Sequence, residues 1–194
     1  MTLGFDCATK LTAASAKRLK DTGFNYAARY LGNSWKTFNT AEAKAVQGAG
    51  LKLISIFQKS ANYSGYFTES QGVSDGKEAE RYARAVGQPE GSAIYFAVDF
   101  AAQPIHMRGI LNYITGVKKT LKGYKVGLYG SYAVMQAVKG RLITTGKPTH
   151  GPAVKLQTSS ICTSFIMTLL WPVWLLIVIV LKRAQGIGVV YKLK

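Results

Sequence analysis

Short hydrophobic runs alternate with amphipathic stretches along the chain up to Lys139. Runs of about four to eight apolar residues are typical of buried strands, and apolar residues about three or four positions apart are typical of helices. Strands are predicted in this way at 3–6, 26–30, 51–58, 93–99 and 125–129. Five strands separated by helices in this regular order indicate an α/β fold, with parallel strands joined by right-handed crossovers.

The predicted helices lie between these strands and have recognisable start and stop signals. They are expected at 12–20, 41–50, 76–87, 105–121 and 130–139. Thr12 is a plausible N-cap of the first helix, and we interpret Asp75 as part of the cap of the third. The Tyr/Gly/Ser-rich loop at 62–72 is longer than most connections and is therefore a candidate functional loop.

The pattern changes after residue 147. No charged residue occurs from Leu156 to Leu181, and 165–181 is almost wholly apolar. This length satisfies the criterion for a membrane span, so membrane association through 165–181 is one prediction. An aberrant tail, from truncation or a different reading frame, is an equal alternative, and a pair of buried core strands is a third. We therefore divide the chain into a domain at 1–147 and an atypical tail at 148–194.

The composition narrows the classes of partner. A formal net charge of +16 favours an anionic partner such as nucleic acid, acidic lipid or bacterial wall polymer. Only the charge supports nucleic acid, because no reader motif is present, so we expect no nucleic-acid partner. Two cysteines exclude a disulfide scaffold, and neither metal-ligand spacing nor a phosphate-binding loop occurs, so no metal or cofactor is expected. The first residues enter a predicted strand without the pattern of a signal peptide.

Two carboxylates stand at the ends of predicted strands and are the leading candidates for chemistry. Asp6 ends the first strand and Asp99 ends the fourth, and no acidic residue follows Asp99. The carboxyl ends of parallel strands form the functional face of open α/β sheets and barrels. The two side chains are therefore expected near one another on that face.

With these residues placed, the chain resembles the Rv2525c-like, glycoside-hydrolase-like domain of unknown function, a relative of the glycoside hydrolase family 25 lysozyme barrels. The matching segments are GFD at 4–6, ARYLG at 28–32, the helix-to-strand step from Glu42 to Leu51, IFQ at 56–58, IYFAVD at 94–99 and VGLYGS at 126–131. They cover about residues 3 to 140 in order.

The resemblance implies a (β/α) TIM-type barrel, and the expected later strands are not recognisable, so the barrel is predicted to be incomplete. Its open face would hold Asp6, Gln58, Asp99 and Tyr129, together with Arg29. The resemblance also implies a cell-wall polysaccharide, peptidoglycan above all, as the partner, and a location in the cell envelope or outside the cell. The related lysozymes carry their glutamate general acid where this chain has Ala101.

Cleavage of a glycosidic bond needs one carboxyl to protonate the leaving oxygen and a second group to attack or stabilise the anomeric carbon. We assign Asp99 as the acid and Asp6 as the nucleophile or base. Gln58 suits sugar hydroxyls, and Tyr30 and Tyr129 suit sugar ring faces. Because of Ala101, two hypotheses stay open: a lysozyme-like glycoside hydrolase, and an inactive wall-binding module whose two aspartates only hold the mouth of the barrel together.

Overall fold

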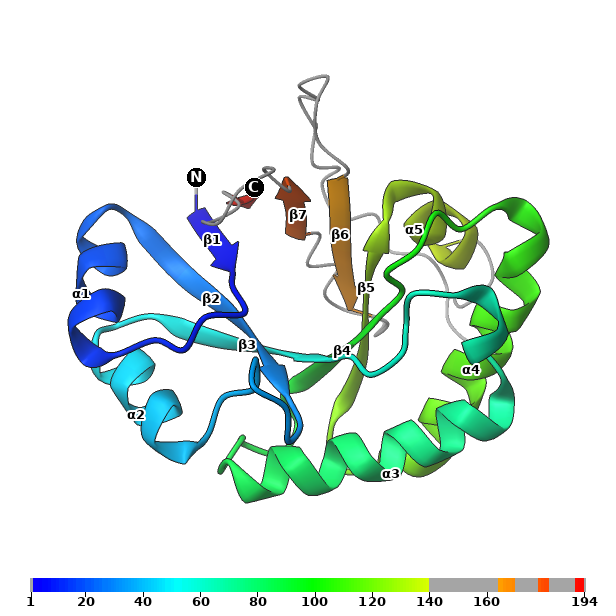
Figure 1. Cartoon of the computed structure of the whole chain (residues 1–194), viewed down its shortest axis with the longest axis horizontal. Helices are drawn as coiled ribbons and strands as arrows, with labels where there is room; N and C mark the ends of the chain where they lie inside the picture. The colour runs from blue at the N-terminus through cyan, green and yellow to red at the C-terminus, as the bar shows by residue number, and fades with distance from the viewer. Residues whose placement is uncertain (1, 140–163, 170–177, 182–190, 194) are drawn as a thin grey trace.

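The computed structural model describes residues 2–139, 164–169, 178–181 and 191–193 (Figure 1). Strands and helices alternate in its first part: β1 (Thr2–Asp6), α1 (Ala13–Asp21), β2 (Phe24–Leu31), α2 (Thr40–Gly48), β3 (Lys52–Phe57), α3 (Glu69–Ala85), β4 (Ala93–Ala97), α4 (Met107–Thr120), β5 (Lys125–Ser131) and α5 (Tyr132–Lys139). Two short 3-10 helices, η1 (Ser64–Tyr66) and η2 (Pro104–His106), lie in the connections after β3 and β4. The five predicted strand–helix units are confirmed.

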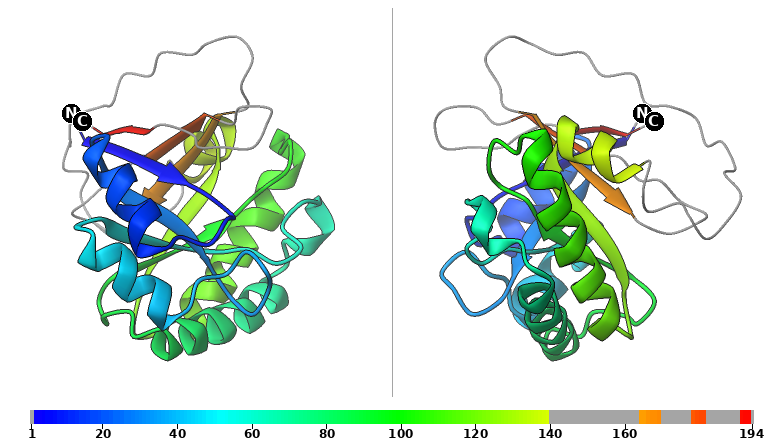
Figure 2. Two further views of the ribbon diagram at one scale, coloured as in Figure 1. Left: turned by 60° about the vertical axis from the view of Figure 1, so that its left-hand side comes forward. Right: turned by 90° about the vertical axis from the view of Figure 1, so that its right-hand side faces the viewer.

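The five strands β1 to β5 are parallel and lie side by side in chain order. They form a curled half-barrel, with helices α1 to α4 along its outer side (Figures 1 and 2). Three further strands, β6 (Ser164–Leu169), β7 (Val178–Leu181) and β8 (Tyr191–Leu193), extend this sheet. They pair antiparallel, β6 with β5, β7 with β6 and β8 with β1. The α/β class and the incomplete barrel agree with the prediction, whereas the parallel closure of a TIM-type barrel is not observed among the described residues.

Parts of the apolar tail lie in this sheet. Strands β6 and β7 cover both ends of the 165–181 segment, and 170–177 lies outside the described residues. Among the described helices, none combines the length and the apolar character that a membrane crossing requires. The predicted domain boundary at 147 also lies outside the described residues.

Helices α3 and α4 pack in close contact beneath the sheet, because glycines line their interface. A Cβ atom at Gly72 would lie 2.0 Å from the carbonyl oxygen of Tyr113, and one at Gly116 would lie 2.1 Å from that of Glu69. Only residues without a side chain allow backbones to approach this closely. The two helices therefore form a tight pair that supports the connections after β3 and β4.

The interpretation of Asp75 as a helix cap is wrong. Helix α3 starts at Glu69, and the hydroxyl of Thr68 caps it by accepting a hydrogen bond from the backbone N–H of Gln71. Asp75 is fully buried inside the helix pair. Its carboxylate accepts hydrogen bonds from the hydroxyls of Tyr66 at 2.6 Å and Tyr113 at 2.7 Å, and from the Gln71 amide at 2.8 Å. These donors offset the loss of water around the charge and fix η1 against α3 and α4.

Candidate functional site

The register of the sheet brings the predicted site residues to one edge. Asp6 is the last residue of β1, Tyr30 lies one residue before the end of β2, and Gln58 directly follows β3. Asp99 lies two residues beyond β4, and Tyr129 belongs to β5. Because the five strands are parallel and in register, all five residues lie at the carboxyl end of the half-barrel, which we call the mouth.

The curvature of the sheet brings β1 and β5 close together at the mouth. Strands β1 and β5 are separated by three other strands in the sheet order. Nevertheless, the hydroxyl of Tyr129 donates a hydrogen bond to Oδ2 of Asp6 at 2.9 Å. This contact can form only because the strands bend round toward each other, so the curvature places the Asp6 carboxylate over the interior of the half-barrel rather than at its rim.

Asp99 belongs to a second polar chain at the mouth. Its Oδ2 accepts a hydrogen bond from Nε2 of Gln58 at 2.8 Å, and Oε1 of Gln58 accepts one from Nζ of Lys36 at 2.9 Å. The ammonium of Lys36 also lies 4.3 Å from the centre of the Tyr30 ring. A cation on one end of the Gln58 amide and a carboxylate on the other fix the orientation of that amide. The sequence reasoning missed Lys36, although its position in the connection directly after β2 could have indicated it.

The two aspartates act on the same pair of tyrosines. Burial raises the pKa of Tyr30 far above its ordinary value, and the negative charges of Asp6 and Asp99 raise it further. The same three causes, burial first, raise the pKa of Tyr129. Both phenols therefore stay protonated at neutral pH, and the Tyr129 hydroxyl remains a hydrogen-bond donor to Asp6. Because both carboxylates influence both rings, the four groups share one electrostatic environment at the mouth.

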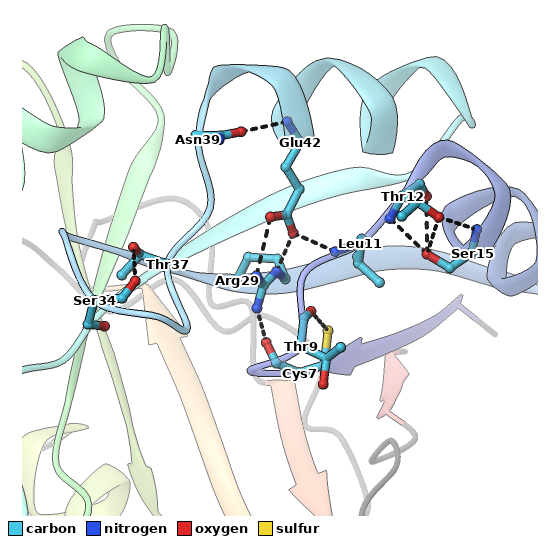
Figure 3. Close-up of polar contacts among 10 residues, drawn as sticks. All are labelled: Cys7, Thr9, Leu11, Thr12, Ser15, Arg29, Ser34, Thr37, Asn39 and Glu42. Atoms are coloured by element: carbon cyan, nitrogen blue, oxygen red, sulfur yellow. Dashed lines mark hydrogen bonds and ion pairs between the residues drawn. The ribbon is translucent and has the colours of Figure 1, made fainter.

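Arg29 does not fit the substrate-binding role that the resemblance implied. Its side chain is fully buried, and its Nε donates to Oε1 of Glu42 on α2 at 2.6 Å (Figure 3). A further nitrogen donates to the carbonyl oxygen of Cys7, and the Leu11 backbone N–H donates to Glu42 at 3.1 Å. Arg29 and Glu42 therefore hold the connection that follows Asp6. The buried ion pair joins β2 to α2 and does not face the mouth.

The aromatic residues of the connections after β2 and β3 differ in their exposure to solvent. Trp35 is 81% exposed and Tyr63 is 54% exposed, as expected for residues at the rim of the mouth. Tyr66 and Phe67, in the same connection as Tyr63, are buried instead. They pack against Tyr113 of α4, which explains their burial. Within the described ranges, no group of three histidine, cysteine or acidic side chains is arranged to hold a metal ion.

Cys7 lies beside Asp6, and its thiol donates to the carbonyl oxygen of Thr9 at 3.4 Å (Figure 3). Burial raises the pKa of this thiol from 9.0 to about 11, and the charge of Arg29 offsets only part of the increase.

In a Cys162→Ser background, we therefore expect iodoacetamide to alkylate Cys7 slowly at pH 8, with a rate that rises up to about pH 11. The folded state prefers the neutral thiol, so this group also removes stability as the pH rises from 9.0 to about 11.

The urea-unfolded chain is the control for this measurement, because its thiol should titrate at the ordinary value. A folded chain whose alkylation rate already levels off below pH 9.0 would contradict the prediction. The same result would make Cys7 a candidate nucleophile, a role that a protonated thiol cannot fill at neutral pH.

Comparisons with known proteins agree with this fold. A family model described as the Rv2525c-like, glycoside hydrolase-like domain matches residues 17–167. Two proteins of Bacillus subtilis (strain 168) are similar to the chain. The uncharacterized protein YbfG is 34% identical over 143 residues, which are 64% of this chain and 20% of that protein. The uncharacterized protein FadG is 29% identical over 135 residues, which are 64% of this chain and 23% of that protein. The match thus spans about a fifth of each relative.

Two crystal structures have similar folds. The Mycobacterium tuberculosis Tat-secreted protein Rv2525c, in complex with HEPES, superposes with a TM-score of 0.62 at 22% identity, covering 72% of this chain and 73% of that one. An uncharacterized protein of B. stearothermophilus superposes with a TM-score of 0.59 at 19% identity, covering 84% of this chain and 85% of that one. At these identities the two likenesses establish the fold alone.

Proposed function

The chain belongs to the Rv2525c-like, glycoside hydrolase-like domain family, and from this membership we propose that it hydrolyses glycosidic bonds of bacterial cell-wall glycan, peptidoglycan above all. The observation that carries the proposal is the pair of carboxylates at the mouth. Asp6, at the end of β1, is hydrogen-bonded at 2.9 Å to Tyr129 of β5, and β5 lies beside β4, the strand that Asp99 follows. Two carboxyl groups facing one space are what hydrolysis of a glycosidic bond requires.

In the proposed reaction, Asp99 protonates the oxygen of the leaving sugar, and Asp6 either attacks the anomeric carbon or activates a water molecule. Tyr129 holds Asp6 in place through its hydroxyl, and Gln58 does the same for Asp99 through its amide. Tyr30 contributes a ring at the same edge of the sheet. The net charge of +16 favours the approach to an anionic cell envelope, where we propose that the protein acts.

The alternative is a wall-binding module without catalysis. Ala101 favours it, because this exposed position holds no acid where the related lysozymes place one. In that case the two polar chains, Tyr129 with Asp6 and Lys36 through Gln58 with Asp99, would only shape the mouth and bind sugar hydroxyls.

The test is incubation of the full chain with purified cell wall, with two measurements on the same sample. One is the release of new reducing ends, and the other is the fraction of protein that sediments with the wall. We expect release of reducing ends by the parent chain and none by the Asp6→Asn/Asp99→Asn double variant. Sedimentation without release of reducing ends would support the binding module. A chain that shows no sedimentation and no release would overturn both functions.

A further inference from the structure

The exposed large hydrophobic side chains of the described residues all lie around the mouth. They are Trp35, Tyr63 and Ile105, which are 81%, 54% and 83% exposed. Each belongs to a different connection, and the three connections leave the carboxyl ends of the neighbouring strands β2, β3 and β4. Because two of the three carry aromatic rings, Trp35 and Tyr63 are the candidates for a binding surface at this end of the molecule, and Ile105 is not.

The connections after β2 and β3 share a second feature. In each of them an aromatic residue stands beside an asparagine and a serine, in Asn33-Ser34-Trp35 and in Asn62-Tyr63-Ser64, and all six residues are exposed. We call these two segments the aromatic loops. A flat ring offers a surface for the apolar face of a sugar, and the neighbouring amide and hydroxyl groups offer hydrogen bonds to its hydroxyl and acetamido groups. Ile105 has no ring, and Pro104 and His106 flank it.

The loop that carries Trp35 is held in one conformation. The backbone N–H and the hydroxyl of Thr37 both donate to the Ser34 carbonyl, at 3.1 and 2.6 Å (Figure 3). The Phe38 backbone N–H donates to the Tyr30 carbonyl at 3.0 Å. Gly32 adopts a φ of +142°, which residues with side chains rarely adopt. Inside this framework Lys36 lies against Tyr30 and Gln58, whereas Trp35 is exposed to solvent.

Tyr63 is held by its own supports. Its ring meets that of Tyr66 edge-on, with 6.2 Å between ring centres, and the Tyr66 hydroxyl is bound to the buried Asp75. The ring also lies over Gly65, where a Cβ atom would come within 3.2 Å of it. A ring that is already fixed loses little conformational entropy when a ligand binds. The Tyr63 ring is therefore pre-organised, and Trp35 stands on a loop whose backbone is held by hydrogen bonds.

We propose that the two aromatic loops are binding subsites for successive sugar rings, so that the protein takes an extended glycan chain rather than a single sugar or a short glycoside. This inference rests on the proposed function and names the substrate form for the same mouth. The polar residues beside each ring favour a glycan over a lipid surface, since a lipid contact needs a continuous apolar patch.

The experiment measures binding by calorimetry in the Asp99→Asn background, which prevents cleavage. The probes are the hexasaccharide and the disaccharide of alternating N-acetylglucosamine and N-acetylmuramic acid. We expect Trp35→Ala and Tyr63→Ala each to weaken hexasaccharide binding about tenfold, as for a central binding residue, and to change disaccharide binding little. Trp35→Phe should restore most of the affinity, because a ring is kept. Ile105→Ala is the matched control and should bind as the parent does.

The outcomes separate this inference from the proposed function. A parent chain that binds neither probe nor intact wall overturns the proposed function. A parent chain that binds the hexasaccharide, with both aromatic variants unchanged, overturns the subsites alone. An equal loss of hexasaccharide affinity in Ile105→Ala would show a general apolar contact and would also overturn the subsites. The subsites would likewise be overturned if the parent bound phosphatidylglycerol vesicles and Trp35→Ala abolished that binding.

Discussion

Replacing Asp99 with asparagine is expected to lower the rate of wall-glycan cleavage by about 10²–10⁴-fold, the usual contribution of a positioned general acid. Asparagine has nearly the same shape but carries no proton to give to the leaving oxygen. Its side-chain oxygen can still accept the hydrogen bond that Gln58 now donates to Oδ2 at 2.8 Å. The variant should therefore fold and bind the glycan as the parent does, so that the loss falls on kcat and not on KM.

Asp21→Asn is the matched control for this variant. This substitution makes the same chemical change on the exposed surface of α1, where Asp21 pairs with Lys17 at 2.9 Å. It should leave both the cleavage rate and the melting temperature unchanged. An Asp99→Asn variant that keeps more than about a tenth of the parent rate would remove Asp99 from the role of acid, since even a modest general acid contributes more. Asp6→Asn, measured in parallel, should lose activity with Tyr129 still bound to its side chain.

The elements that carry the mouth could be predicted because they depend on local patterns. Each strand is a short apolar run, and each helix repeats its apolar residues at helical spacing, so the order of elements and their parallel pairing follow from sequence. The same logic places Asp6 and Asp99 at strand ends. It also explains why β2, predicted at 26–30, extends over Phe24–Leu31, since strand ends are the least defined part of such a pattern.

Contacts between distant polar groups could not be predicted in this way. Burial patterns do not say that Arg29 meets Glu42 from the next helix, or that the hydroxyls of Tyr66 and Tyr113 surround Asp75. Asp75 also matched the local signature of a helix cap, which made the wrong interpretation the simpler one. The apolar tail illustrates a different limit, because a continuous hydrophobic run does not by itself predict where the strands β6 and β7 begin and end.

Replacing Glu42 with alanine is expected to lower the free energy of unfolding by about 3–5 kcal/mol, because it leaves the fully buried guanidinium of Arg29 without its counter-charge. The Leu11 backbone N–H loses its acceptor at the same time. Urea unfolding followed by circular dichroism measures the change. Asp21→Ala is the control, since loss of its exposed pair with Lys17 should cost no more than about 0.5 kcal/mol.

The double variant Arg29→Met/Glu42→Leu decides whether the missing counter-charge is the cause. It removes both charges and fills the space with apolar groups, so it should be clearly more stable than Glu42→Ala alone. A double variant that is less stable than Glu42→Ala would mean that the hydrogen bond from Arg29 to the carbonyl oxygen of Cys7, rather than the charge balance, dominates. In either case the connection after Asp6 loosens, and wall cleavage should fall even at temperatures where the variants stay folded, since Asp6 takes its position from that connection.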